Sequence, residues 1–247
     1  MKKETIAVWF SCGAASAVAA KKTIEKYGET HNIWIINTPV KEEDEDNQRF
    51  LNDVSKWIGQ PILRALNKNY PNFSCVDVWE KGYMSGQTQY GATCTFELKI
   101  KARQQFEETN KIDSHVFGFT LEEKSRHDNF TKFERTNVIP VLIDAKLTKQ
   151  DCFDILMSND IELPRIYKLG YPNANCIGCV KATSPTYWNH VRKMHPQTFN
   201  ERAEQSRKIG AKLVRYKGKR IFLDELPEDA IGRKMKSYEC GIFCDTK

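Results

Sequence analysis

The first half of the chain alternates between short apolar runs and stretches whose apolar residues recur at helical spacing. The run from Thr5 to Phe10 leads through small residues into a helical pattern from Ser16 to Tyr27, which Gly28 ends. A second apolar run spans Ile33 to Ile36, and a second helix is expected from Asn47 to Ile58. Strands and helices that alternate in this way form a parallel sheet, which binds ligands at the carboxyl ends of its strands.

The remaining pattern extends this sheet and adds a C-terminal part. Ile62 to Leu66 and His115 to Phe119 are predicted to be further strands, and a helix is expected from Cys94 to Glu108. The residues from Pro185 to Ile209 have a helical pattern, and Arg215 to Phe222 has the pattern of a hairpin. We therefore predict an α/β fold: a mostly parallel, twisted sheet of five or six strands with helices on both faces, followed by a C-terminal extension.

Composition is that of an ordinary globular protein. Of 247 residues, 40% are hydrophobic and 28% are charged, and the net charge of +6 suits either a polyanion or a small anion as partner. No run approaches the roughly 18 apolar residues that span a bilayer, and no signal peptide is visible, so a cytoplasmic protein without membrane association is expected. The acidic run from Glu42 to Asp46 is expected to be the solvated start of a helix.

The eight cysteines indicate metal ligands or catalytic thiols, because disulfide frameworks are rare in reducing compartments. Cys176 and Cys179 form a Cys-x-x-Cys pair, and Cys94 precedes them. Zinc and a cubane iron–sulfur cluster each take about four such ligands. Cys75 and Cys152 lie in apolar segments and are expected to be inert core residues.

A loop of small residues joins the first strand to the first helix. Backbone N–H groups in such a loop can approach an oxyanion closely, the helix N-terminus favours negative charge, and two serine hydroxyls add donors. A tight turn of purely structural purpose has the same composition. The candidate binding residues are Ser11, Cys12, Gly13, Ala14, Ala15 and Ser16, with Asn37 and Thr38 at the end of the second strand.

The Ser-x-Gly-x-x-Ser pattern of this loop resembles the PP-loop of the ATP pyrophosphatase and sulfonucleotide (phosphoadenylyl sulfate) reductase superfamily. The segment with Gly118, Thr120 and Arg126 resembles the one that holds the nucleotide's phosphate or sulfate in that family. Ala15 stands where the ATP-hydrolysing branch usually has an Asp, which points to the reductase-like branch.

A longer stretch resembles the reductase signature, in which a strand, a short helix, an Ile-Pro…Tyr segment, a Gly-Tyr pair and a cysteine pair follow one another. The matching segments are Pro140 to Asp144, Thr148 with Asp151, Ile161 to Tyr167, Gly170 to Pro172, and Cys176 to Cys179. Similar variants are found among phage- and prophage-borne reductase-like proteins. The resemblance implies a nucleotide-binding domain over residues 1–180 and an extension with a cysteine-containing tail over residues 181–247.

The resemblance implies an oxidoreductase that reduces adenylyl sulfate, or its 3′-phosphate, to sulfite with a thioredoxin-like thiol donor. Cys240, in a tail that resembles the family's terminal Glu-Cys-Gly motif, is then the nucleophile. Lys99 is expected to donate to a cluster sulfide or to the substrate's anionic group, with a solvated lysine as the alternative.

The resemblance also implies a 4Fe–4S cluster on Cys94, Cys176 and Cys179. The fourth ligand is Cys244, Cys240 or an exogenous group, and structural zinc is the alternative metal. If the fourth iron position is open, the chain resembles PP-loop sulfurtransferases that use ATP and thiolate a tRNA or DNA base. A non-catalytic nucleotide-binding module with structural zinc is a further alternative, and a homodimer is compatible with each of these hypotheses.

Overall fold

The computed structural model describes residues 3–81, 84 and 91–235. These residues form two compact units. The first, here called the sheet unit, comprises the described residues up to Pro39 together with Glu45–Leu66 and Arg103–Arg165. The second, the cysteine unit, comprises Val40–Asp44, Asn67–Ala102 and the described residues from Ile166 onward. The cysteines of interest therefore group with the C-terminal residues.

The sheet unit is built on four parallel strands, β1 (Thr5–Phe10), β2 (Asn32–Asn37), β3 (Ile62–Arg64) and β4 (Ser114–Val116), in the order β3-β2-β1-β4. The prediction of five or six strands is wrong for the described residues. The apolar stretch after residue 137 makes only one bridge, from His115 to Val138, and then forms the short helix α7 (Val141–Asp144). Pro140 lies between the two and has no N–H to continue a ladder.

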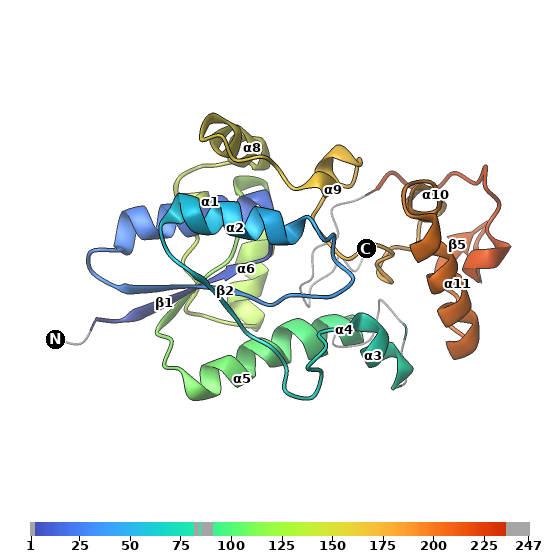
Figure 1. Cartoon of the computed structure of the whole chain (residues 1–247), viewed down its shortest axis with the longest axis horizontal. Helices are drawn as coiled ribbons and strands as arrows, with labels where there is room; N and C mark the ends of the chain where they lie inside the picture. Colours follow the sequence, from blue (N-terminus) through green and yellow to red (C-terminus); the bar gives the residue numbers. More distant parts are fainter. Residues whose placement is uncertain (1–2, 82–83, 85–90, 236–247) are drawn as a thin grey trace. The chain divides into compact units, whose positions relative to one another are not determined.

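Helices cover both faces of this sheet, as the pattern predicted (Figure 1). On one face, Phe10 stacks on Phe50 of helix α2 (Asn47–Ile58), with 6.1 Å between ring centroids. On the other, Trp9 meets Phe106 of helix α5 (Ala102–Thr109) edge to face at 6.2 Å. Adjacent strand residues point to opposite faces, so a run that is buried throughout, as β1 is, requires helices on both sides.

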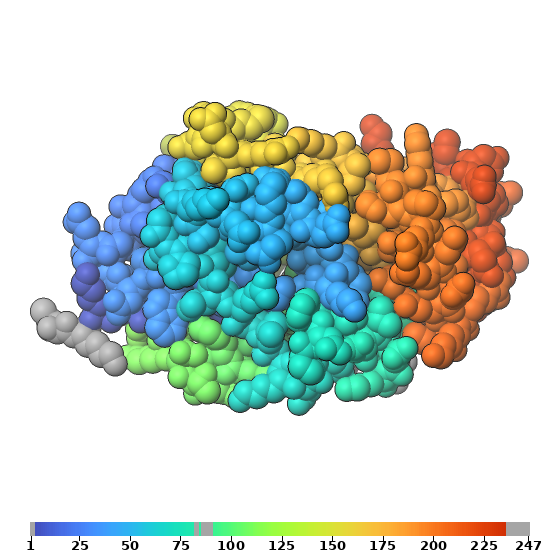
Figure 2. Space-filling view, viewed as in Figure 1, coloured from blue at the N-terminus to red at the C-terminus, as the bar shows by residue number. Residues whose placement is uncertain are grey.

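The remaining elements of the sheet unit follow their sequence signals closely. Helix α1 (Ala14–Tyr27) ends at Gly28, and α2 ends at Gly59 in the left-handed conformation. The 3₁₀ turn η2 (Leu121–Glu123) leads into α6 (Lys124–Phe133), and α8 (Lys149–Ser158) begins with the predicted capping box of Thr148 and Asp151. Helix α8 packs against α1. Its yellow atoms border the light-blue and cyan atoms of the segment that contains α2 (Figure 2).

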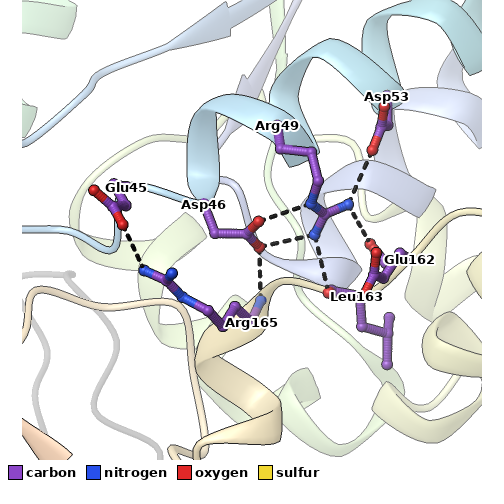
Figure 3. Close-up of polar contacts among 7 residues, drawn as sticks. All are labelled: Glu45, Asp46, Arg49, Asp53, Glu162, Leu163 and Arg165. Atoms are coloured by element: carbon purple, nitrogen blue, oxygen red, sulfur yellow. Dashed lines mark hydrogen bonds and ion pairs between the residues drawn. The ribbon is translucent and has the colours of Figure 1, made fainter.

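Arg49 connects the start of α2 to a distant segment of the sheet unit (Figure 3). Its guanidinium donates to both carboxylate oxygens of Asp46, at 2.7 and 2.8 Å, and to Asp53 at 2.9 Å. It also donates to the backbone carbonyls of Glu162 and Leu163, each at 3.1 Å. The hydrogen bond with Asp46 is the largest cause that raises the pKa of Arg49, and it lowers the pKa of Asp46.

Arg49→Lys is expected to lower the free energy of unfolding by about 1–3 kcal/mol, because an ammonium cannot reproduce this planar set of donors. Thermal and denaturant unfolding will measure the loss. Arg207→Lys is the matched control, since Arg207 pairs with Asp224 and Glu225 on the surface and its replacement should cost clearly less than that of Arg49. Equal losses in the two variants would show that the Arg49 network contributes nothing beyond an ordinary surface pair.

The cysteine unit is mainly helical. Its helices are α3 (Cys75–Glu80), α4 (Thr93–Thr95), the π-helical segment η1 (Phe96–Lys101), α10 (Pro185–Met194) and α11 (Pro196–Ile209). The single helix predicted after residue 185 is thus two, which lie side by side (Figure 1) and are separated at His195 because Pro196 starts a new helix.

The elements that complete the chain are short. Helix α9 (Arg165–Lys168) crosses the boundary between the units, and the 3₁₀ turn η3 (Leu223–Glu225) follows the predicted hairpin. That hairpin is β5 (Val214–Tyr216) and β6 (Lys219–Ile221), whose turn residues Lys217 and Gly218 have φ of 45° and 79°. Among the described residues, no helix combines the length and the apolar character needed to cross a lipid bilayer.

Candidate functional site

The loop between β1 and α1 has a shape that its own side chains maintain. Gly13 is extended and precedes the first helical residue, and Cys12 is left-handed with φ of 56°. The Ser16 hydroxyl accepts from the Ser11 N–H at 3.1 Å and donates to the Gly13 carbonyl at 2.8 Å. Ser16 is 4% exposed, so its hydroxyl shapes the loop from within, whereas Ser11 lies on the surface. The first turn of α1, with Ala14 and Ala15, turns its N–H groups toward the loop.

Asn37 supports the loop from the neighbouring strand. Its amide donates to the Phe10 carbonyl at 2.8 Å and to the Cys12 sulfur at 3.7 Å. Asn37 is buried, and Thr38 follows it in a half-buried position. The structure therefore brings Asn37 to the loop as predicted, where it holds the turn that carries the candidate phosphate-binding backbone.

Gly118 lies against the backbone of the same loop. A β-carbon built on Gly118 would come within 2.8 Å of the Ser16 nitrogen and 3.0 Å of the Ala15 carbonyl carbon. Only a residue without a side chain fits there, so the chain after β4 and the loop form one surface of backbone groups. The sequence-based grouping of Gly118 with the loop agrees with this geometry.

Thr120 and Arg126, predicted to hold the nucleotide's anion, both interact with Glu123. Thr120 forms a capping box with Glu123, and the Arg126 guanidinium donates to the Glu123 carboxylate at 2.6 Å. Arg126 also lies over the Phe119 ring, 5.2 Å from its centroid. The structure thus shows these two side chains organising the start of η2 and α6.

In the cysteine unit, Cys94 and Cys176 are brought together through a third thiol that the sequence-based prediction missed. Cys75, buried at the start of α3, hydrogen-bonds to the thiols of Cys176 and Cys94, and these contacts raise the pKa of the Cys75 thiol. The hydrogen bond from Cys75 is also the largest cause that lowers the pKa of Cys94 to about 7, with the charge of Lys181 adding to it. Cys75 is buried as expected, but it is part of a thiol cluster.

The Cys-x-x-Cys loop is held in place by its own glycine and by α10 and α11. Gly178 is left-handed, with φ of 71°, and a β-carbon there would meet the Arg202 side chain at 3.1 Å. The Cys179 N–H donates to the Tyr187 hydroxyl at 2.8 Å. Cys176 and Cys179 are both 8% exposed and belong to one buried cluster with Cys75.

Glu42 links α3 to the Cys-x-x-Cys loop. Its carboxylate accepts from the Ser74 hydroxyl at 2.6 Å and from the Cys75 N–H at 2.8 Å. Its backbone carbonyl accepts from the Ile177 N–H at 2.9 Å. One residue therefore positions the segments that carry Cys75, Cys176 and Cys179 relative to one another.

Lys99 is not the solvated lysine of the alternative prediction, because it is 8% exposed. Its ammonium donates to the Glu43 carboxylate at 2.9 Å. With Glu42 and Asp46 also bonded, the acidic run is not the solvated helix start that was expected. These carboxylates are instead structural partners of residues far away in the sequence.

Two buried donors lie beside the cysteine cluster. The Trp79 side chain hydrogen-bonds to the Cys94 thiol, and this contact helps to lower the pKa of Cys94. The Arg202 Nε–H is buried without an acceptor among the described residues, and the Arg202 guanidinium lies 4.8 Å from the Trp79 ring centroid. Buried donors normally have acceptors, and the sulfur atoms of thiolates or of an iron–sulfur cluster would serve here.

Cys240, the predicted nucleophile, and Cys244, a predicted metal ligand, lie outside the described residues. Within the part of the chain that the structure covers, no three His, Cys, Asp or Glu side chains are already arranged to hold a metal ion. The thiols of Cys94 and Cys176 are instead hydrogen-bonded to that of Cys75.

Comparisons with known proteins identify the fold but not a family. No protein-family model matches the chain, and no curated protein matches it. Among solved structures, it is similar to the U34-tRNA thiolase NcsA from Methanococcus maripaludis, solved with its [4Fe-4S] cluster. The TM-score is 0.50 at 13% sequence identity, and the match covers 100% of this chain and 82% of that chain. The chain therefore has an α/β fold like that of this thiolase.

Proposed function

We propose that the chain is an ATP-dependent sulfur-transfer enzyme that thiolates a nucleic-acid base and carries a 4Fe–4S cluster on Cys94, Cys176 and Cys179. The observation that carries this proposal is the buried cluster to which all three cysteines contribute, in a chain that also has a PP-loop-type turn. The thiolase-like fold supports it. The net charge of +6 suits a polyanionic substrate.

The cysteine set fits such a cluster chemically. Cys176 and Cys179 are buried, Cys94 is partly buried with a lowered pKa, and the buried Arg202 Nε–H needs an acceptor. Thiolates are the usual ligands of iron–sulfur clusters, and hydrogen bonds to sulfur tune them. When bound, the cluster would supply a site at which a sulfur donor is held for transfer.

The loop would bind the nucleotide's phosphates. Backbone N–H groups at the start of α1 and the Ser11 hydroxyl would hold the anion, and Gly118 leaves the space for close approach. A base carbonyl oxygen would attack the α-phosphate of ATP and release pyrophosphate. A sulfur nucleophile would then attack the activated carbon, and AMP would leave with the oxygen.

A second candidate function is the reduction of adenylyl sulfate, or its 3′-phosphate, to sulfite with a thioredoxin-like donor. Ala15 is the observation that favours it, because no carboxylate stands there to bind the magnesium of ATP. In this reaction the nucleotide arrives already activated, and a cysteine thiolate attacks its sulfur and releases the adenosine phosphate.

The experiment that separates these functions uses anaerobically reconstituted protein. With ATP, magnesium, a sulfide source and bulk tRNA or single-stranded DNA, the proposal expects pyrophosphate release that depends on nucleic acid, together with thiolated nucleosides detected by mass spectrometry. Sulfite formed from adenylyl sulfate, without pyrophosphate release from ATP, would replace the first candidate by the second. A protein with no iron and no turnover in either assay would refute both.

A further inference from the structure

We propose that Cys75 is a fourth thiolate ligand of the metal centre, beside Cys94, Cys176 and Cys179. This inference rests on the metal centre of the proposed function but concerns a residue that the sequence pattern assigned to the core. Three features of the cysteine unit support it: thiol contact, a shared anchor, and buried N–H donors around the cluster.

The first feature is the central position of Cys75 among the thiols. It touches both Cys94 and Cys176, which are separated by 82 positions in the chain and by different elements. A metal that displaces the thiol protons would exchange the thiol–thiol hydrogen bonds for sulfur–metal bonds as the four sulfur atoms gather around it.

The second feature is that Cys75 and the Cys-x-x-Cys loop share one anchor. The Glu42 carboxylate binds the Cys75 N–H, while the backbone carbonyl of Glu42 binds the Ile177 N–H between Cys176 and Cys179. Ser74 adds a cap at the start of α3, with its hydroxyl accepting from the Val76 N–H at 3.1 Å. The position of Cys75 is thus determined together with that of the paired cysteines.

The third feature is the surroundings of the cluster. Arg202 is 3% exposed, and its unpartnered Nε–H lies next to Gly178, at 3.4 Å from where a β-carbon would stand. Trp79 is also buried, and its side chain hydrogen-bonds to the Cys94 thiol. Four thiolates make a centre more negative than three, and buried cationic and N–H donors offset that charge.

A fourth protein thiolate has a consequence for reactivity. A tetrahedral metal, or a cubane with one cysteine at each iron, has no vacant position when four thiolates bind it. A sulfur donor would then reach the metal only by displacing one of these cysteines. Cys75 thus takes the coordination position that the sequence-based hypotheses assigned to Cys244, Cys240 or an exogenous group.

The test compares five single variants of the full-length protein: Cys75→Ser, Cys94→Ser, Cys176→Ser, Cys179→Ser and, as control, Cys152→Ser. Cys152 is buried in α8 of the sheet unit, where burial raises its pKa to about 12. Each is reconstituted anaerobically with iron and sulfide and, separately, with zinc. Metal per chain, visible absorbance and far-UV circular dichroism are recorded.

The expected result is that Cys75→Ser lowers metal affinity at least about tenfold, as the other three ligand variants do, while Cys152→Ser matches the wild type. X-ray absorption of the zinc-loaded wild type should show four sulfur atoms bound to the zinc ion. The zinc-loaded Cys75→Ser variant should show only three. The wild-type spectrum needs no variant, so a misfolded variant does not leave the proposal untested.

The outcomes separate this inference from the proposed function. Full metal binding and an unchanged spectrum in Cys75→Ser, with loss in the other three, overturns the role of Cys75 and leaves the proposed cluster intact. Four-sulfur zinc binding without any iron–sulfur cluster supports the four-thiolate site and overturns the proposed function. A wild-type protein that binds neither metal overturns both.

Discussion

Gly118→Ala is expected to weaken adenine-nucleotide binding at least about tenfold, which corresponds to about 1.4 kcal/mol of binding free energy. The added methyl would meet the Ser16 nitrogen at 2.8 Å and the Ala15 carbonyl carbon at 3.0 Å. Both are backbone atoms, so the loop has to move as a whole and its N–H groups leave their positions. Calorimetric titration with ATP and AMP will measure the change, and thermal unfolding should show a loss of about 1–3 kcal/mol from overpacking.

Gly59→Ala is the matched control for this experiment. Gly59 ends α2 with φ of +75° and has nothing within 4 Å of where a β-carbon would stand. Its replacement should cost about 1–2 kcal/mol of stability through backbone strain alone and leave nucleotide affinity unchanged. If Gly118→Ala binds nucleotide as tightly as Gly59→Ala does, the loop next to Gly118 is not the nucleotide site.

Glu42→Ala is expected to lower the free energy of unfolding by about 2–4 kcal/mol. The variant removes a charged acceptor from the Ser74 hydroxyl and from the Cys75 N–H, and the buried N–H is left without that partner. Because the same carboxylate positions Cys75, metal content after reconstitution should fall as well. Denaturant unfolding and metal analysis will measure the two effects. The stability and metal content of Glu42→Gln should lie between those of Glu42→Ala and the wild type, since an amide oxygen can still accept a hydrogen bond.

Glu45→Ala is the control for the acidic run. Glu45 has 86% of its side chain exposed and forms a surface ion pair with Arg165 at 3.2 Å. Its removal should cost less than about 1 kcal/mol and leave metal content unchanged. Similar losses in both variants would mean that Glu42 is no more than another surface carboxylate.

The contrast between Glu42 and Glu45 shows where the sequence-based prediction failed. Five residues from Glu42 to Asp46 look alike in a pattern of polar positions, so a solvated helix start was the reasonable prediction. The structure gives Glu42, Glu43 and Asp46 partners at Ser74, Lys99 and Arg49. The first two partners are more than 30 positions away, and no local spacing rule relates them to the run.

The candidate site was predicted only in part for the same reason. Gly118 was grouped with the loop because a family resemblance related the two segments, and the close approach of backbones agrees with it. Cys75 was missed because it stands alone in an apolar segment, without a second cysteine at ligand spacing. Its one local signal was Ser74, which caps α3, and a cap says nothing about what the next side chain touches.

By itself, the sequence determined the features that depend on neighbouring residues. These are β1, the glycine ends of α1 and α2, the capping box of α8 and the hairpin turn at Lys217 and Gly218. Backbone conformation and hydrophobic period decide such features within a few residues. Tertiary structure alone decided the number of strands among the described residues, the ion pair of Lys99 with Glu43 and the meeting of Cys75 with Cys94 and Cys176. These three features depend on contacts between segments that are far apart in the sequence. Such contacts form only when the whole unit folds and buries its apolar residues.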